Sequence, residues 1–160
     1  TPLIVHWPAG IPAARRGKID AQPGHLIDLM ATCVDLSGAK YPARFNGEAI
    51  TPMEGVSLRP ALEGKSLRRP QPIFWEHEGN AAIRVGKWKL VKRYPCDWEL
   101  YDMEADRTEL NDLAAIHPER VAEMTLQYEA WAKRCGVLPR DKIVELMRSQ
   151  GVTRAFWEKD

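Results

Sequence analysis

The stretch IFWEHEGNAAIRVGKWKLVKRY, residues 73–94, decides the fold of this chain. Aromatic and β-branched residues dominate it and the segment that follows, and this composition is typical of β-strands. The predicted strands are IFWEH (73–77), AAIRV (81–85), WKLVKRY (88–94) and WELYDM (98–103). Glu78-Gly79-Asn80 has the residue types of a hairpin turn, and Pro95-Cys96-Asp97 separates the last two runs. The pattern predicts a three- or four-stranded antiparallel meander.

A long helix is predicted after the meander. Apolar residues recur there at steps of three and four, which places them on one face of a helix. They are Val121, Met124, Tyr128, Trp131 and Cys135. Pro118 and Glu119 suit the first turn of this helix, and Gly136 suits its end. We therefore expect a helix over 118–135 and a last short helix over about 141–150.

The first 72 residues have a different pattern. TPLIVHWP (1–8) is a nearly continuous apolar run bounded by prolines, which predicts a buried strand. HLIDLMATCVDLSG predicts a helix over 25–37, well buried on one side and ended by Gly38. Segments 8–24 and 39–72 are rich in Pro and Gly, which predicts irregular structure. Because a buried strand needs neighbours on both sides, we expect residues 1–8 to pair with a preceding part of a longer chain.

The composition is close to the average of soluble globular proteins. The 160 residues are 44% hydrophobic and 28% charged, which excludes collagen-like, coiled-coil and largely disordered classes. No apolar run approaches the roughly 18 residues of a membrane span, so no membrane partner is expected. Lys and Arg total 23 against 22 Asp and Glu, a net charge of +1. This balance gives no basis for a nucleic-acid partner, and no segment indicates a cellular compartment.

Motifs for catalysis or metal binding are not found in the sequence. The three cysteines form no C-x-x-C pair, and we interpret them as small buried or half-buried thiols. Three of the four histidines lie at helix starts or in an apolar run, and we interpret them as structural. No G-x-S-x-G, no phosphate-binding Gly-rich loop and no H-E-x-x-H occurs. No catalytic or metal-binding residue is therefore assigned.

The densest polar cluster surrounds the turn of the predicted hairpin. Alternation along a strand puts Glu76 and His77 on opposite faces, so they are not a ready-made ligand set. Two interpretations stay open: a solvated hairpin tip, or a hairpin that faces the substrate in a larger protein. In the second, the planar fork of Arg84 suits an anionic group. The candidate substrate contacts are Glu76, His77, Asn80 and Arg84.

Six segments, taken in order, closely resemble the C-terminal stretch of sulfatases of the arylsulfatase type. They are TPLIVHWPAGI, GHLIDLMATCVDLSGA, GVSLRPALEG, IFWEHEGNAAIRVGKWKLV, WELYDMEADRTELNDLA and HPERVAEM. The resemblance extends over nearly the whole chain, to about residue 138. Its most specific parts are residues 75–91 and 98–114.

The resemblance implies an alkaline-phosphatase-like hydrolase of aryl or carbohydrate sulfate esters. Members of that family use a formylglycine, made from Cys or Ser in a C/S-x-P-x-R motif, and a calcium ion held by carboxylates and an Asn. Neither is expected here, because the cysteines lie outside such a motif and the calcium ligands have no counterpart. The resemblance therefore predicts a C-terminal fragment that is inactive alone. Its expected partners are the rest of the sulfatase chain and a sulfated small molecule or saccharide.

The implied fold is α/β, becoming α+β in the C-terminal part. Residues 1–72 are expected to be the remainder of the large sulfatase domain and a linker, with the strand at 2–7 and the helix at 25–37 at the edge of its central sheet. Residues 73–160 are expected to form a small four-stranded antiparallel sheet packed on a C-terminal helix. Such a subdomain abuts the rim of the active-site cleft, which supports the hairpin residues as substrate contacts.

Two alternatives stay open beside the sulfatase. A phosphonate or phosphodiester hydrolase of the same superfamily would differ in its nucleophile and number of metal ions. A stand-alone carbohydrate-binding or interaction module would stack sugars on Trp75, Trp88 or Trp98. The six tryptophans of the chain more simply build a hydrophobic core.

Overall fold

The computed structural model describes residues 2–151 of the chain, which divide into two compact units. The boundary falls between Pro70 and Gln71. We refer to residues 2–70 as unit 1 and to residues 71–151 as unit 2. The interpretation of the first 72 residues as part of a larger domain stays a prediction.

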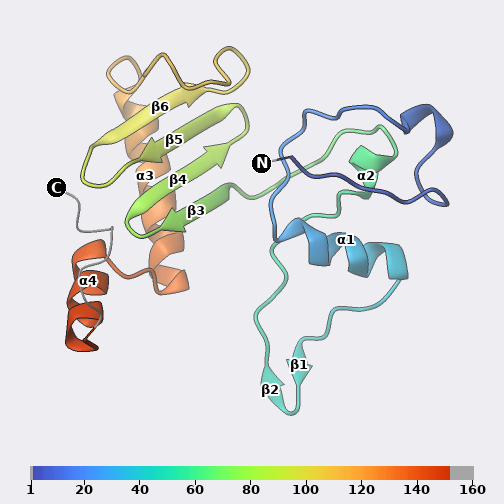
Figure 1. Cartoon of the computed structure of the whole chain (residues 1–160), viewed down its shortest axis with the longest axis horizontal. Coiled ribbons are helices and arrows are strands. Elements are labelled where there is room, and N and C mark those ends of the chain that lie inside the picture. The colour runs from blue at the N-terminus through green and yellow to red at the C-terminus, as the bar shows by residue number, and fades with distance from the viewer. Residues whose placement is uncertain (1, 152–160) are drawn as a thin grey trace. The chain divides into compact units, whose positions relative to one another are not determined.

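Unit 2 contains the predicted meander, and it has four strands. These are β3 (Ile73–His77), β4 (Asn80–Val85), β5 (Trp88–Lys92) and β6 (Trp98–Asp102). Each strand is antiparallel to its sequence neighbour, so the order in the sheet is β3-β4-β5-β6 (Figure 1). The β3–β4 connection is two residues long, with φ of 52° at Glu78 and 86° at Gly79. Two consecutive positive φ values are those of the tight hairpin turn that matches strand twist.

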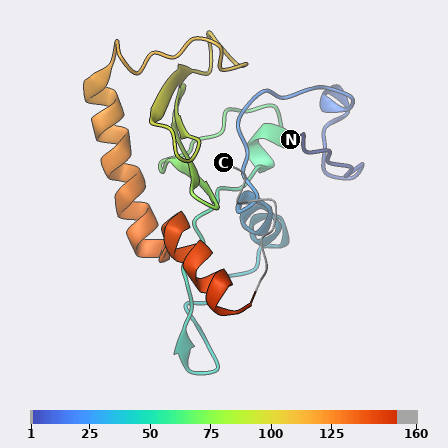
Figure 2. The same ribbon diagram turned by 60° about the vertical axis from the view of Figure 1, so that its left-hand side comes forward.

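Helix α3 (Pro118–Cys135) covers one face of this sheet, as Figures 1 and 2 show. Its bounds are those predicted from the apolar spacing. The buried core between helix and sheet consists of Ala81, Ile83, Leu90, Leu100, Met124 and Tyr128. At its margin the rings of Phe74 and Trp131 stack with centroids 4.9 Å apart. Since burying one large apolar side chain contributes about 1.5–3 kcal/mol, this core organises unit 2.

The segment between β6 and α3 covers the outer edge of β6. The Asp112 carboxylate accepts a hydrogen bond from the Leu100 N–H at 2.9 Å, and the Leu113 N–H donates to the Leu100 carbonyl at 2.8 Å. An exposed strand edge is a template for unwanted pairing, and these two bonds satisfy the backbone N–H and C=O of Leu100 on that edge. The last helix, α4 (Arg140–Ser149), follows α3 and begins one residue before the predicted position.

Unit 1 contains short elements joined by long connections. They are the 3₁₀ helix η1 (Ala13–Arg15), α1 (Asp28–Ser37), β1 (Arg44–Phe45), β2 (Glu48–Ala49) and α2 (Arg59–Leu62). Helix α1 ends at Gly38, as predicted, with φ of 69°. It begins three residues later than predicted, because residues 25–27 form a turn around the Asp28 side chain.

Unit 1 differs from several expectations, and the expected pairing of residues 1–8 with a preceding part of a longer chain stays a prediction. Residues 2–7 form no strand, and Leu3 and Ile4 are 56% and 90% exposed. A strand exists only when its backbone pairs with a neighbour, and no described segment pairs with these residues. Helix α1 is also not well buried, since only Asp28 and Ala31 on it are buried. The cysteines differ from expectation in both units, because all three thiols are exposed.

A buried carboxylate organises unit 1. The Asp28 side chain is fully buried and accepts hydrogen bonds from the His25 N–H at 2.7 Å, the Val56 N–H at 3.0 Å and both terminal nitrogens of Arg69. Burial raises the pKa of Asp28, but the bonds from Arg69, Val56 and His25 outweigh it and hold the pKa below its ordinary value. A Cβ on Gly55 would lie 2.1 Å from the Ile27 carbonyl oxygen, so this close approach requires glycine.

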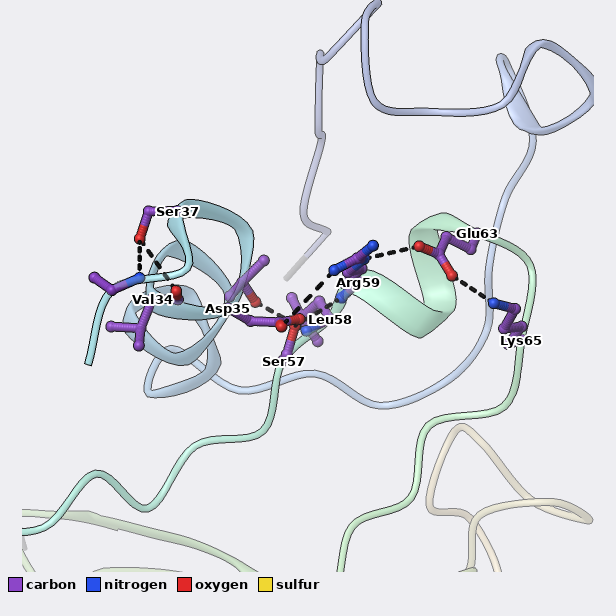
Figure 3. A network of polar contacts seen from close by, with 10 residues as sticks. Val34, Asp35, Ser37, Ser57, Leu58, Arg59, Glu63 and Lys65 are labelled. Carbon is purple, nitrogen blue, oxygen red and sulfur yellow. Dashed lines mark hydrogen bonds and ion pairs between the residues drawn. The ribbon is translucent and has the colours of Figure 1, made fainter. Parts of the chain in front are cut away.

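A second polar network joins α1 to α2 within unit 1 (Figure 3). The Ser57 hydroxyl donates to Asp35 at 2.7 Å, and the Arg59 Nε pairs with Glu63 at 2.8 Å. Lys65 pairs with the other oxygen of Glu63 at 2.7 Å. These side chains are largely exposed, so the pairs contribute less than the buried Asp28 cluster.

Candidate functional site

The β3–β4 turn is held by hydrogen bonds from the side chains beside it. The Glu76 carboxylate accepts from the Gly79 N–H at 2.8 Å. The Asn80 amide nitrogen donates to the His77 carbonyl at 2.9 Å, and its oxygen accepts from the Tyr94 N–H at 3.2 Å. Backbone and side chains therefore order the turn at both its ends.

The strand register divides the four predicted site residues between two faces. His77 and Asn80 are cross-strand partners, and partners in an antiparallel pair project to the same face. Arg84 follows Asn80 by four residues on β4 and shares that face, roughly 13 Å along the strand. This outer face is opposite to the one that carries Ile83 and Leu90 against α3.

Glu76 lies on the other face. Its cross-strand partner is Ala81, a member of the helix-side core. Its charge also acts on Tyr128 of α3: burial raises the pKa of Tyr128 to about 12, and the Glu76 carboxylate contributes to the rise. Together with the bond from Gly79, this makes Glu76 a residue that holds the turn, whereas His77, Asn80 and Arg84 share the outer face.

A shallow, open hollow of about 270 Å³ surrounds this end of the hairpin. It is lined by residues that include Trp75, His77, Asn80 and Arg93. A tryptophan ring, hydrogen-bonding groups and a guanidinium are the groups that contact the faces, hydroxyls and anionic substituents of a polar ligand. These lining groups make the hollow the candidate binding surface of unit 2.

Arg84 lies outside the hollow. Its Nε donates to the Gly86 carbonyl at 3.0 Å, within the β4–β5 turn. Partial burial lowers the pKa of Arg84, and the charge of Arg107 lowers it further. An arginine stays cationic at neutral pH even so, and the side chain presents a positive charge beyond the His77–Asn80 pair.

The calcium and formylglycine implied by the resemblance do not fit the residues of this chain. Within residues 2–151, no group of three or more His, Cys, Asp or Glu side chains could hold a metal ion. Calcium sites in proteins are built largely on clustered carboxylates, and these residues contain no such cluster. None of the cysteines lies in a C-x-P-x-R motif. No chemical step is therefore assigned to this chain.

Sequence reasoning missed two features of the structure. The Asp28–Arg69 pair joins residues 41 positions apart, and neither residue stands out among the other charges of the chain. The contact of Arg140 with the carbonyl of Glu78 joins residues 62 positions apart. None of the described helices is both long and apolar enough to cross a membrane.

Comparisons with known proteins agree with the fold. The family model described as "N-sulphoglucosamine sulphohydrolase, C-terminal" matches residues 1–133. A choline-sulfatase of Rhizobium meliloti is 32% identical over 132 residues, which are 78% of this chain and 23% of that protein. A sulfatase of Schizosaccharomyces pombe is 26% identical over 90% of this chain and 27% of its own length. The chain thus spans about a quarter of the length of these relatives.

Solved structures lead to the same class. The crystal structure of Ps i-CgsB aligns with a TM-score of 0.65 at 25% identity, over 93% of this chain and 33% of that one. A complex of the same protein with k-i-k-neocarrahexaose aligns with a TM-score of 0.62 at 29% identity, over 79% of this chain and 27% of that one.

A four-stranded antiparallel sheet packed on a helix, with these neighbours, defines the class as sulfatases of the alkaline-phosphatase-like fold. More particularly, the chain belongs to the N-sulphoglucosamine sulphohydrolase C-terminal family. The predicted resemblance to the C-terminal stretch of sulfatases is confirmed.

Proposed function

We propose that this chain is the C-terminal part of a hydrolase of sulfate esters, and that it contributes to substrate binding at the rim of the active site. The substrate class is a sulfated saccharide or an aryl sulfate. In this proposal the formylglycine nucleophile and the calcium ion belong to the rest of the sulfatase chain, and the chain described here is inactive alone. Membership of the family and the sulfatase relatives support the chemistry.

The observation that carries the rim role is the pairing of His77 with Asn80 on the outer face, beside the hollow. An imidazole and an amide supply hydrogen-bond donors and acceptors to sugar hydroxyls, and Trp75 supplies a flat apolar surface. Arg84 supplies a cation further along the same face, where a longer anionic saccharide would extend. Glu76 serves by ordering the turn, through the bond from the Gly79 N–H.

The test is steady-state kinetics of the full-length sulfatase carrying this sequence. We expect His77→Ala to raise KM for a sulfated saccharide by about tenfold, the loss of one hydrogen bond, while kcat changes little. A small aryl sulfate that does not reach the rim should show a smaller change in KM. Gln127→Ala on α3, on the far side of the sheet, is the matched control and should leave both constants unchanged. Equal KM values for the parent and His77→Ala enzymes on the saccharide would contradict the rim role.

A further inference from the structure

Helix α4 contacts the turn that carries the candidate site. It lies beyond residue 133, where the match to the family model ends. Its first residue, Arg140, has a side chain only 16% exposed, and its Nη1 donates to the Glu78 carbonyl at 2.7 Å. The same nitrogen lies 3.8 Å from the Glu78 carboxylate. A charged donor therefore holds the backbone of the turn itself.

The Arg140 side chain makes a second contact, with Tyr94. Its guanidinium carbon lies 5.3 Å from the centroid of the Tyr94 ring, within the range of a cation–π interaction. The Tyr94 N–H in turn donates to the Asn80 side chain at 3.2 Å. Arg140 is thus linked to Asn80 by two routes, through the carbonyl of Glu78 and through Tyr94.

The fit between α4 and the turn is close. A Cβ on Gly79 would lie 2.9 Å from the Cβ of Arg140, so the backbone approach has no room for a side chain. Apolar residues of α4 complete the contact: Ile143, Val144 and Met147 enclose, with Glu78, a cavity of only about 10 Å³. The turn and α4 are therefore packed against each other with almost no space between them.

From these contacts we propose that α4 fixes the position of the β3–β4 turn for substrate recognition, with Arg140 as the positioning residue. The bonds from Asn80 to His77 and from Tyr94 to Asn80 transmit the position of the turn to both outer-face residues. Arg140 acts on the substrate only through them. The inference rests on the proposed rim function, and it assigns a role to a helix that lies beyond the residues matched by the family model.

The first measurement is amide hydrogen exchange of the 160-residue chain. In Arg140→Ala we expect exchange at the Gly79 and Tyr94 amides to become about tenfold faster, because a charge-assisted bond that holds the turn is lost. Exchange at Leu90, in the core, should not change. Lys142→Ala, which removes a 65% exposed cation of the same helix, is the control and should change neither region. Unchanged exchange at Gly79 and Tyr94 in Arg140→Ala would overturn the proposal.

The second measurement is the KM of the full-length sulfatase for a sulfated saccharide. Arg140→Ala should raise KM about fivefold at constant kcat, and Arg140→Lys should restore part of this, because lysine can donate to the Glu78 carbonyl but cannot stack as a plane on Tyr94. If exchange at the Leu90 amide also becomes faster in Arg140→Ala, that variant has lost core stability. The exchange rates and the KM of Arg140→Lys then decide the test.

The outcomes separate the two proposals. If His77→Ala raises KM and neither Arg140 variant does, the positioning role is overturned and the rim function stands. If neither His77→Ala nor the Arg140 variants change KM, the rim function is contradicted. The positioning role of Arg140, which rests on it, is then contradicted as well. A rise in KM for both residues, with partial rescue by lysine, supports both.

Discussion

The two units of the chain are organised by opposite means. Unit 2 is built on a continuous apolar core, in which Ile83, Leu90 and Leu100 are fully buried between the sheet and α3. Unit 1 has only two buried apolar residues, Ala31 and Leu58, and its centre is the carboxylate of Asp28. Many large apolar side chains of unit 1 are exposed, among them Ile4, Ile19, Leu26 and Phe45.

This difference indicates which interactions stabilise each unit. The attraction within an apolar core is non-directional and depends on the volume that is packed, whereas a buried carboxylate is stable only while the donors around it are in place. We therefore expect unit 1 to depend on single polar residues and unit 2 to depend on the volume of its core.

The largest effect should come from Asp28→Ala. It leaves the Arg69 guanidinium, 14% exposed, without its buried partner, and breaking such a pair costs about 3–5 kcal/mol. Hydrogen exchange should become much faster at the amides of Val56 and Leu58 in unit 1 and stay slow at Leu90 in unit 2. Asp35→Ala, at a 43% exposed surface pair, is the control and should cost about 1 kcal/mol or less. Equal losses of stability in Asp28→Ala and Asp35→Ala would contradict the central role of the buried carboxylate in unit 1.

Leu100→Ala is the corresponding change in unit 2. It removes a fully buried side chain from the core and should lower the free energy of unfolding by about 3 kcal/mol through lost burial and a residual cavity. Urea unfolding followed by the fluorescence of the unit 2 tryptophans measures it. Leu126→Ala on the exposed side of α3, where the side chain is 66% exposed, should change it by less than about 0.5 kcal/mol. A comparable loss at Leu126 would contradict the assignment of the core.

Alkaline pH should act on unit 2. Burial raises the pKa of Tyr101 and of Tyr128 to about 12, so both phenols are protonated in the folded unit at a pH where the unfolded chain ionises them. This stability is complete below about pH 10 and is lost as the pH rises to about 12, by about 2 kcal/mol for each group. Tyr128→Phe should flatten the fall of stability with pH, as measured by urea unfolding of the parent chain and the variant at a series of pH values between about 8 and 12. Identical pH profiles for the parent chain and Tyr128→Phe would show that the core tyrosine is not the cause.

The smallest effect is expected at the glycines that end one helix in each unit. Gly38 and Gly136 end α1 and α3 with φ of 69° and 68°, and neither has an atom near the position of an added Cβ. Alanine at either position should therefore cost about 1 kcal/mol, the strain of a left-handed residue, without any clash. Thermal unfolding of the two variants measures it. Unequal costs would show that the caps of the two units differ in more than local backbone strain.

Unit 2 was predictable because its structure follows from local pattern. Strand alternation, the turn residues Glu78 and Gly79, and the apolar spacing of α3 all act over a few positions, and the predicted meander and helix are confirmed. The same alternation already placed Glu76 and His77 on opposite faces. The short turn makes Asn80 the first residue of β4, which brings it opposite His77.

Unit 1 was not predictable in the same way. An apolar run such as residues 2–7 shows that burial is favourable but not which neighbour supplies it, and no described segment does. The Asp28 cluster depends on Arg69, 41 residues away, and on a backbone approach at Gly55. Such contacts have no periodicity, so no pattern in the sequence indicates them. The same holds for Arg140 and the turn.

Release of inorganic sulfate is the most direct test of the proposed function. The full-length polypeptide that carries this sequence, incubated with a sulfated saccharide or an aryl sulfate, should release sulfate, while the 160-residue chain alone should release none above a buffer control. A phosphonate or phosphodiester assayed in parallel should be hydrolysed far more slowly. Preferential release of the phosphorus-containing product, or sulfate release by the 160-residue chain alone, would contradict the proposal.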